Sequence, residues 1–423
     1  MEQIKETKIK KKLTPTLRFE GFKEEWKKMR IGEIAIITTG NTPSTTVTEY
    51  YNGRKLFVSP ADLNDSRYVY NTKTTLTELG FKQGRKVSKG SVLFVCIGST
   101  IGKVGQATDE CLTNQQINSL EALKNFDNNF IYGLLEKNGK KIRLLAGVQA
   151  VPQINKTDFS NFKYYLPSLP EQQKIASFLS AIDEKIQLLT RKKELLEEYK
   201  KGVMQQLFSG KLRFKDEKGK AFPNWERKSL RDFVLNYKGG APLSPSDFTK
   251  EPGCEVIPKK GITSGGRLII DIETPTYCKP SFYQAYSKSV INNSYLITTL
   301  RDLVPSGPSI GYIVQYNSNN KYILAQGVYA FEIDEGKLNK EWVIQFSNTI
   351  EYRKIMQTIM VGSTQVHIRN EEFFKVELNL PSINEQKRIA NYLSSIDNKI
   401  EIVNRQITQT QTFKKGLLQQ MFV

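Results

Sequence analysis

One long stretch occurs twice in this chain, and the repeat restricts the possible folds more than any other feature. Residues Glu171 to Phe208 recur 214 positions later as Glu385 to Phe422, with 17 identities in 38 positions. Apolar residues in both copies alternate at steps of four and three, which is typical of a coiled-coil seam rather than of the broad face of a globular helix. The predicted seam residues are Ile175, Leu179, Ile182, Ile186, Leu189, Leu196 and Val203 in the first copy, and Ile389, Leu393, Ile396, Ile400, Val403, Ile407 and Leu417 in the second.

Each copy spans roughly 55 Å if it is fully helical. We predict that the two matching seams bury each other; the alternative is that each helix belongs to a separate bundle. Lysines at 193, 200 and 414 interrupt the seams, and the sequence offers no packing role for them.

The repeat extends into the segments that precede each long helix. Trp26 and Pro43 have counterparts in Trp225 and Pro242, both 199 positions later, and the offset grows to 214 at the helices because insertions accumulate in between. The chain is therefore one unit of about 200 residues used twice, a variable globular part followed by a constant helix. The predicted divisions are a basic mobile tail (1–20), a first globular part (21–168), a central long helix (169–210), a Lys- and Gly-rich linker (211–221), a second globular part (222–382) and a final long helix (383–423).

Each globular part combines short β-branched and aromatic runs with one helical stretch. Runs such as SVLFVCIG and YILAQGVYAFEI are separated by Gly, Asn, Ser and Pro, as expected for strands joined by turns. The helical stretches cover residues 129–147 and 340–360. The predicted fold class is α+β, with two globular domains of mixed sheet plus helices separated by the two long helices, and with pseudo-twofold symmetry from the repeat.

Net charge indicates a polyanionic partner. The chain has 62 Lys and Arg against 43 Asp and Glu, a formal charge of +19. For a protein without a membrane-spanning run or a signal peptide, nucleic acid is the commonest such partner. The alternative is a generally lysine-rich proteome. Four cysteines without a CxxC spacing indicate reduced thiols and a cytoplasmic location.

Catalytic and metal-binding motifs are missing. A single histidine excludes most His-dependent catalysis and any His-rich metal site. GSTIGKV (98–104) resembles a phosphate-binding loop, but its glycines are too close together and Val104 replaces the magnesium-binding hydroxyl. We predict no catalytic residue, no bound metal and no cofactor on this chain.

Loops that recur in both globular parts carry residues suited to reading DNA. Gln and Asn pair bidentately with adenine and Arg with guanine, whereas Lys contacts phosphate. For any one glycine loop a plain hairpin turn is the alternative, and a solvated surface explains any one lysine. The candidates are Thr39, Gly40, Asn41, Thr42, Lys55, Ser99, Thr100, Lys103, Gln115, Gln116, Gln149 and Gln153 in the first part, and Lys238, Gly239, Gly240, Lys259, Lys260, Arg267, Arg301, Ser309, Gln326, Thr364, Gln365 and His367 in the second.

With both LP-x-(x)-EQ-xx-IA-xxL-xx-ID-xxI helices in view, together with GVQAVPQI and the KKGVMQQLFSGKLRF exit, the sequence resembles the specificity subunit of type I restriction-modification systems. The resemblance implies two target-recognition domains held apart by an antiparallel helix pair, each reading one half of a split, asymmetric site in double-stranded DNA. It also implies that two modification (methyltransferase) subunits methylate one adenine in each half-site, and that restriction subunits add translocation and cleavage. S-adenosylmethionine, ATP and magnesium belong to those partners.

Two other classes of function remain open at this point. One is a self-contained methyltransferase or nuclease with unrecognised motifs, which requires activity of the chain alone. The other is a coiled-coil structural or RNA-binding protein, which shows no preference for duplex sequence. The basic amino-terminal extension has no assigned role.

Overall fold

The computed structural model describes residues 14–63, 66–146, 152–270, 276–315 and 321–423, and the chain divides into two compact units. Unit 1 comprises Met1–Lys193 and Val403–Val423, and unit 2 comprises Glu194–Ile402. Each unit therefore combines one globular part with portions of both long helices, α5 (Leu169–Phe208) and α10 (Ile383–Met421).

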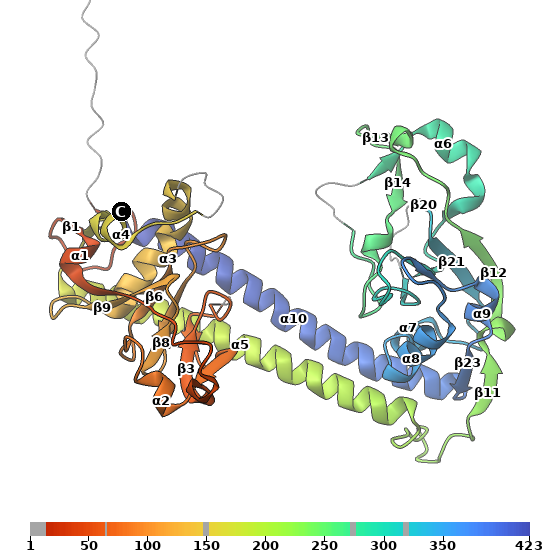
Figure 1. The fold of residues 1–423 in the computed structure, drawn as a ribbon. Helices are drawn as coiled ribbons and strands as arrows, with labels where there is room; N and C mark the ends of the chain where they lie inside the picture. The colour runs from red at the N-terminus through yellow and green to blue at the C-terminus, as the bar shows by residue number, and fades with distance from the viewer. Residues whose placement is uncertain (1–13, 64–65, 147–151, 271–275, 316–320) are drawn as a thin grey trace, which may run out of the picture. The chain divides into compact units, whose positions relative to one another are not determined.

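Unit 1 contains two sheets that make its globular part an α+β structure (Figure 1). The larger sheet has the order β2 (Ala35–Thr39), β9 (Ile117–Ala122), β6 (Val92–Val95), β7 (Val104–Ala107) and β4 (Tyr68–Val69), and the smaller has the order β5 (Thr74–Leu76), β3 (Tyr51–Val58) and β8 (Cys111–Thr113). The pairs β4–β7 and β3–β8 are parallel and the others are antiparallel, so the predicted mixed sheet is confirmed. The remaining elements are the two-stranded pair β1 (Lys27–Arg30) and β10 (Lys163–Leu166), with α1 (Ile31–Ile34), η1 (Thr48–Tyr50), α2 (Glu78–Phe81), α3 (Asn128–Leu145) and α4 (Lys156–Asn161).

Unit 2 repeats this plan with additions. Its main sheet has the order β12 (Val234–Gly239), β21 (Val328–Ile333), β17 (Leu296–Thr299) and β19 (Ile313–Gln315), which matches β2, β9, β6 and β7 of unit 1. Its second sheet has the order β13 (Phe248–Thr249), β15 (Tyr277–Cys278), β14 (Cys254–Ile257), β20 (Tyr322–Leu324) and β16 (Val290–Ile291), and β14 and β20 are parallel like β3 and β8. The remaining elements are the pairs β11 (Glu226–Ser229) with β23 (Glu377–Leu380) and β18 (Arg301–Asp302) with β22 (Val366–His367), and the helices η2 (Leu230–Phe233), η3 (Pro245–Asp247), η4 (Lys259–Gly261), α6 (Pro280–Ala285), η5 (Ser287–Ser289), α7 (Lys340–Phe346), α8 (Ile350–Ile359) and α9 (Asn370–Phe374).

The helical stretch expected over residues 340–360 is two helices rather than one. The side chain of Thr349 accepts a hydrogen bond from the backbone N–H of Tyr352 at 3.2 Å and so caps the start of α8. A Thr at this position favours the extended backbone of an N-cap over helix continuation. The apolar periodicity runs through the break and does not reveal it.

The long helices contribute directly to the globular cores. In unit 1, Ile175, Leu179 and Ile182 of α5 share a core with Phe130 of α3 and Phe422, which follows α10. The first turns of α10 do the same in unit 2, where Ile389, Leu393 and Ile396 join a core around Trp342. Further along the helices Val403, Ile407 and Leu417 are buried, whereas Ile186, Leu189, Leu196, Val203 and Ile400 are half-buried.

In each unit the two helices run antiparallel. Lys193 of α5 donates to Asn404 of α10 at 3.2 Å in unit 1. Ten residues earlier in α5, Asp183 meets Lys414, which lies ten residues later in α10. In unit 2 the hydroxyls of Tyr199 and Tyr392 are 2.7 Å apart.

A buried glutamate anchors the start of each long helix. Glu171 accepts two hydrogen bonds from the guanidinium of Arg18, at 2.7 and 2.8 Å, and a third from the indole N–H of Trp26 at 3.4 Å. Its neighbour Gln172 accepts from the backbone N–H of Asp127, the N-cap of α3, at 3.1 Å and donates to the carbonyl five residues upstream.

The same arrangement anchors α10. Glu385 accepts from Arg213 at 2.7 and 3.0 Å and from the indole N–H of Trp225 at 3.0 Å. Gln386 accepts from the backbone N–H of Asn339, the N-cap of α7, at 2.8 Å. The Glu-Gln pair that opens each repeat therefore fastens a long helix to its own globular part.

The end of the predicted amino-terminal tail is held in place. We predicted a mobile tail up to residue 20, but Arg18 is bound to Glu171 and the ring of Phe19 packs edge-on against Phe178, with centroids 5.7 Å apart. The backbone N–H of Leu17 also donates to the carbonyl of Gln420 near the end of α10. The backbone N–H of Leu212 donates in the same way to the carbonyl of Gln206 near the end of α5. Leu17 and Leu212 thus each supply a partner for a carbonyl near the end of a long helix, where intrahelical partners are missing. Residues 1–13 lie outside the described part of the chain.

Candidate nucleic-acid interface

The end of strand β2 and the β8–β9 turn form one side of a polar edge in unit 1. The backbone N–H of Gly40 donates to the carbonyl of Ile117 at 3.0 Å, and a Cβ at Gly40 would collide with the side chain of Thr113 and the carbonyl of Asn114. Gly240 of unit 2 is constrained in the same way by the carbonyl of Ala325. Glycine at these two positions allows close approach to the protein's own turn, because any side chain there would collide with it.

Predicted contact residues project from this edge with fixed geometry. The hydroxyl of Thr42 donates to the side-chain oxygen of Gln115 at 2.8 Å, and both side chains are exposed. Thr39 donates to Asn118 at 2.7 Å. Asn41 accepts from the backbone N–H of Arg85 at 2.8 Å, which brings a further loop to the edge.

The β6–β7 turn completes the edge in unit 1. Gly98 donates to the carbonyl of Pro152 at 2.9 Å, and Ile97 pairs with Gln153 as an isolated antiparallel bridge. The side-chain amide of Gln116 reaches the carbonyl of Ile97 at 3.4 Å. Within the same turn Ser99 and Lys103 are exposed and Thr100 is half-buried. Five segments that are distant in sequence thus meet at this edge. Gln149, the other candidate, lies outside the described residues.

Unit 2 builds its edge from the corresponding segments. Arg301 pairs with His367 across strands β18 and β22, in the place of Ile97 and Gln153. The carbonyl of Gly327 accepts from the hydroxyl of Thr299 at 3.0 Å, which places the exposed Gln326 beside the end of β17. Other exposed candidates near this edge are Lys260, Thr364 and Gln365.

Asp302 binds a serine hydroxyl and a lysine at the edge of unit 2. It accepts from the hydroxyl of Ser309 at 2.7 Å and forms an ion pair with Lys259 at 3.4 Å. Burial would raise the pKa of Asp302, but the hydrogen bonds from Ser309 and the charge of Lys259 outweigh it, and the pKa lies below its ordinary value. The hydroxyl of Ser309 is thus engaged by Asp302, and the side chain is half-buried.

Three more basic residues among the predicted DNA contacts, besides Lys259, have partners within their own unit. Lys55 lies 3.3 Å from Glu78 and over the ring of Phe81, and Lys238 donates to the carbonyl of Val290 at 2.7 Å. Arg267 is ion-paired with Glu401 of α10. Sequence alone does not distinguish a basic side chain that meets DNA from one that holds a loop to a neighbouring element.

Arg267 has a counterpart in Arg67, which the sequence did not single out. The guanidinium of Arg67 is almost fully buried and donates to Ser180 and Asp183 of α5 at 2.8 and 3.1 Å. Arg67 thus ties the globular part of unit 1 to α5, and Arg267 ties the globular part of unit 2 to α10. The two arginines lie 200 positions apart, close to the separation of the paired tryptophans, and this spacing could have identified Arg67 from the sequence.

Arg85 and Asn114 are the other edge residues that sequence reasoning missed. Arg85 donates from its guanidinium to the carbonyl of Thr39 at 2.8 Å, and Asn114 donates to Gln116 at 3.0 Å. Asn114 lies in the repeated LTNQQI stretch, so the repeat could have identified it as a candidate from the sequence. Arg85 lies in none of the repeated loops that directed the choice of candidates.

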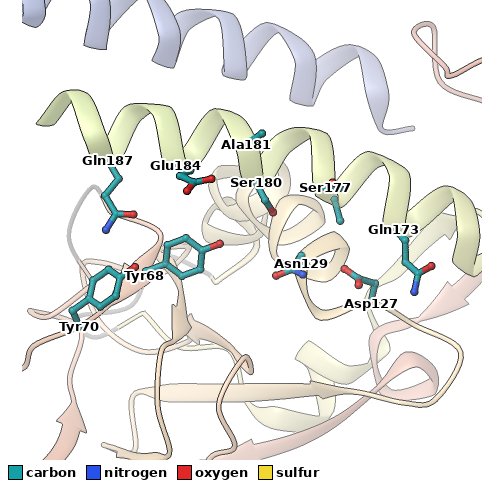
Figure 2. A pocket seen from close by; sticks show the side chains of 11 residues that line it. Tyr68, Tyr70, Asp127, Asn129, Gln173, Ser177, Ser180, Ala181, Glu184 and Gln187 are labelled. Carbon is teal, nitrogen blue, oxygen red and sulfur yellow. The ribbon is translucent and has the colours of Figure 1, made fainter. Parts of the chain in front are cut away.

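A polar groove of about 710 Å³ runs along α5 in unit 1, separate from the loop edge (Figure 2). Figure 2 shows Gln173, Ser177, Ser180 and Glu184 of α5 facing the side of the globular part that carries Asn129 and Tyr68. None of the groove residues belongs to the predicted DNA contacts.

Among the described residues, no group of three or more His, Cys, Asp or Glu side chains is placed to hold a metal ion. Within the same residues, no helix is long and apolar enough to cross a membrane. The polar edges are suited to recognition through hydrogen bonds.

Two globular α+β parts with matching loop edges, each fastened to an antiparallel helix pair, define a two-module binding protein. A family model described as "Type I restriction modification DNA specificity domain" matches residues 23–198 and again residues 223–411. The chain belongs to this family.

Curated relatives and solved structures agree with this assignment. The MjaVIII type I restriction enzyme specificity subunit of Methanocaldococcus jannaschii is 25% identical over 401 residues, covering 93% of this chain and 91% of the relative. The putative MjaX specificity subunit of the same organism is 26% identical over 83% of each chain. The crystal structure of a type I S subunit from M. genitalium superposes with a TM-score of 0.61 at 16% identity, over 97% of this chain and 99% of that one, which shows a common fold.

Proposed function

We propose that this chain is the DNA-reading subunit of a type I restriction-modification complex, in which each unit reads one half of a bipartite, asymmetric site in double-stranded DNA. The observation that carries the proposal is that the same loop edge is built twice with different side chains. Where unit 1 places Ile97 and Gln153, unit 2 places Arg301 and His367. A twofold architecture with unlike reading surfaces fits a split site whose halves differ in sequence.

The exposed edge residues supply the chemistry of readout. Gln115 and Gln326 carry an amide donor and acceptor suited to adenine in the major groove, and Arg301 carries a fork suited to guanine. Lys103 and Lys260 supply positive charge for phosphate contacts, which set affinity and register without reading sequence. Hydrogen bonds such as that from Thr42 to Gln115 fix side-chain orientation before DNA arrives.

Catalysis in this proposal belongs to partner proteins. Two modification subunits carry S-adenosylmethionine and methylate one adenine in each half-site, and restriction subunits carry ATP and magnesium for translocation and cleavage. The present chain binds none of these groups and supplies no catalytic residue. The complex acts in the cytoplasm, where reduced thiols are stable.

Binding by the purified complex of this chain with its modification subunits tests the proposal. We expect the complex to prefer one duplex over a scrambled duplex of equal length by at least about a thousandfold, and to show no such preference among RNAs. Equal binding to all duplexes would contradict specific reading. The chain alone, given S-adenosylmethionine and duplex DNA, should transfer no methyl group, and transfer by the chain alone would support a self-contained enzyme instead.

A further inference from the structure

Two aliphatic side chains stand exposed on a loop of unit 2 that is longer than the corresponding turn of unit 1. Leu303 is 70% exposed and Val304 is 49% exposed. Nine residues separate Arg301 from Gly311 in this loop, whereas four separate Ile97 from Gly102 in the corresponding turn of unit 1. The additional residues are therefore specific to one reading edge.

Internal hydrogen bonds hold this loop in shape. The backbone N–H of Gly307 donates to the carbonyl of Val304 at 2.9 Å, and the hydroxyl of Ser309 donates to Asp302 at 2.7 Å. From outside the loop, the guanidinium of Arg353 donates to the carbonyl of Ile310 at 2.6 Å. Leu303 and Val304 are thus presented to solvent by a hydrogen-bonded loop, although burial would be more favourable for both side chains.

Leu303 and Val304 lie among the residues of the loop edge of unit 2. Leu303 directly follows strand β18. Asp302 of β18 pairs with Val366 of β22, and the exposed Gln365, which directly precedes β22, therefore lies close to this pair. Arg301 precedes the two aliphatic residues in the chain, and Lys259 is bound to Asp302. An apolar contact made by Leu303 or Val304 therefore lies beside side chains that are suited to contacts with base edges and phosphates.

We propose that Leu303 and Val304 contact the C5-methyl group of a thymine in the half-site read by unit 2. This methyl group is the apolar feature that a base edge presents in the major groove, and aliphatic side chains recognise it by contact. The inference rests on the proposed function and makes it more specific, because it assigns a base type to one loop. The shorter turn of unit 1 carries Ser99 and the half-buried Thr100 in place of two exposed aliphatic side chains.

Replacing single thymines by uracil removes only the methyl group and tests the contact directly. The complex with its modification subunits is measured against its mapped target duplex, with each thymine of the half-site of unit 2 replaced in turn. We expect one replacement to weaken binding about three- to fivefold, the effect of one buried methyl group. In the Leu303→Ala, Val304→Ala double variant the same replacement should have no effect.

Two controls separate this contact from a general loss of binding. Leu144→Ala in unit 1 removes a leucine that is 84% exposed and should leave the uracil effect unchanged. Uracil in the other half-site should give equal effects in the variant and the wild type. Wild-type binding that is insensitive to every uracil in the half-site of unit 2, or a variant as sensitive as the wild type, would overturn the proposal. If the complex does not distinguish the target from a scrambled duplex at all, the proposed function itself fails.

Discussion

Lys414 of α10 forms an ion pair with Asp183 of α5 at 2.5 Å, and both side chains are buried. The internal repeat places the same pair in unit 2, where Lys200 of α5 meets Asp397 of α10 at 2.7 Å. All three lysines that interrupt the apolar seams therefore have partners on the opposite helix, since Lys193 donates to Asn404. Buried ion pairs contribute little net stability compared with apolar residues, but unpaired buried charges are strongly unfavourable, so such pairs favour one helix register over others.

Exchanging the charges of Lys200 and Asp397 tests this assignment of register. Lys200→Asp and Asp397→Lys should each destabilise unit 2, because each places like charges together, and the double variant should recover part of the loss. The interaction free energy from the four proteins should lie between about 0.5 and 3 kcal/mol, measured by chemical unfolding. The same exchange at the exposed pair Lys375 and Glu372 serves as the control and should change stability by less than about 1 kcal/mol. Additive effects at Lys200 and Asp397 would contradict a direct pairing.

The buried glutamates at the helix starts make a second prediction. Glu171→Gln should destabilise the anchoring of α5 by about 3–5 kcal/mol, because the guanidinium of Arg18 loses its charged partner in a largely buried position. Thermal unfolding measures the change. Glu198→Gln, at an exposed position of the same helix, should have an effect within about 0.5 kcal/mol. Equal effects at the two positions would show that Glu171 is not an anchor.

The pH dependence of the second reading edge follows from Asp302. Its pKa is lowered, so its contribution to stability is present above the pKa of the unfolded chain, near 3.8, and is lost as the pH falls through the lower folded value. Ser309→Ala should raise the pKa of Asp302 and move the start of acid unfolding of unit 2 to higher pH. Carboxyl chemical shifts followed by NMR measure the pKa, and Ser306→Ala, exposed in the same loop, is the control. An unchanged pKa in the Ser309 variant would contradict the bond.

Lengthening the helix pair should change the distance between half-sites without changing their sequences. One heptad inserted in α5 between Lys193 and Glu194, and another in α10 between Ile402 and Val403, keeps the helix pairing within each unit. Seven helical residues add about 10.5 Å, close to three base-pair steps of about 3.4 Å each. Methylation mapping should show the same two half-sites about three base pairs further apart. Altered half-sites at the original separation would contradict a spacer role.

The repeat made the architecture predictable, whereas the partners of individual side chains within each unit were not predictable. Apolar steps of three and four predicted both long helices, and strand runs such as SVLFVCIG predicted β6. Of the predicted DNA contacts, those placed by turns repeated in both units, such as Gln115 and Gln326, are exposed on the edges. Lys238 and Arg267 have partners inside unit 2, because the geometry of a basic side chain depends on packing that no local pattern encodes. Gly40 and Gly240 were recognised as special positions, but the colliding groups come from turns more than 70 residues away.

Mapping of adenine methylation over the whole genome tests the central claim most directly. Loss of this gene should remove methylation from one split motif, and restoring the wild-type gene should return it. Restoring Gln326→Ala instead should relax the sequence of one half of the motif, and Gln115→Ala should relax the other half. Loss of no split adenine motif, or relaxation of the same half by both variants, would contradict the reading of two half-sites by two units.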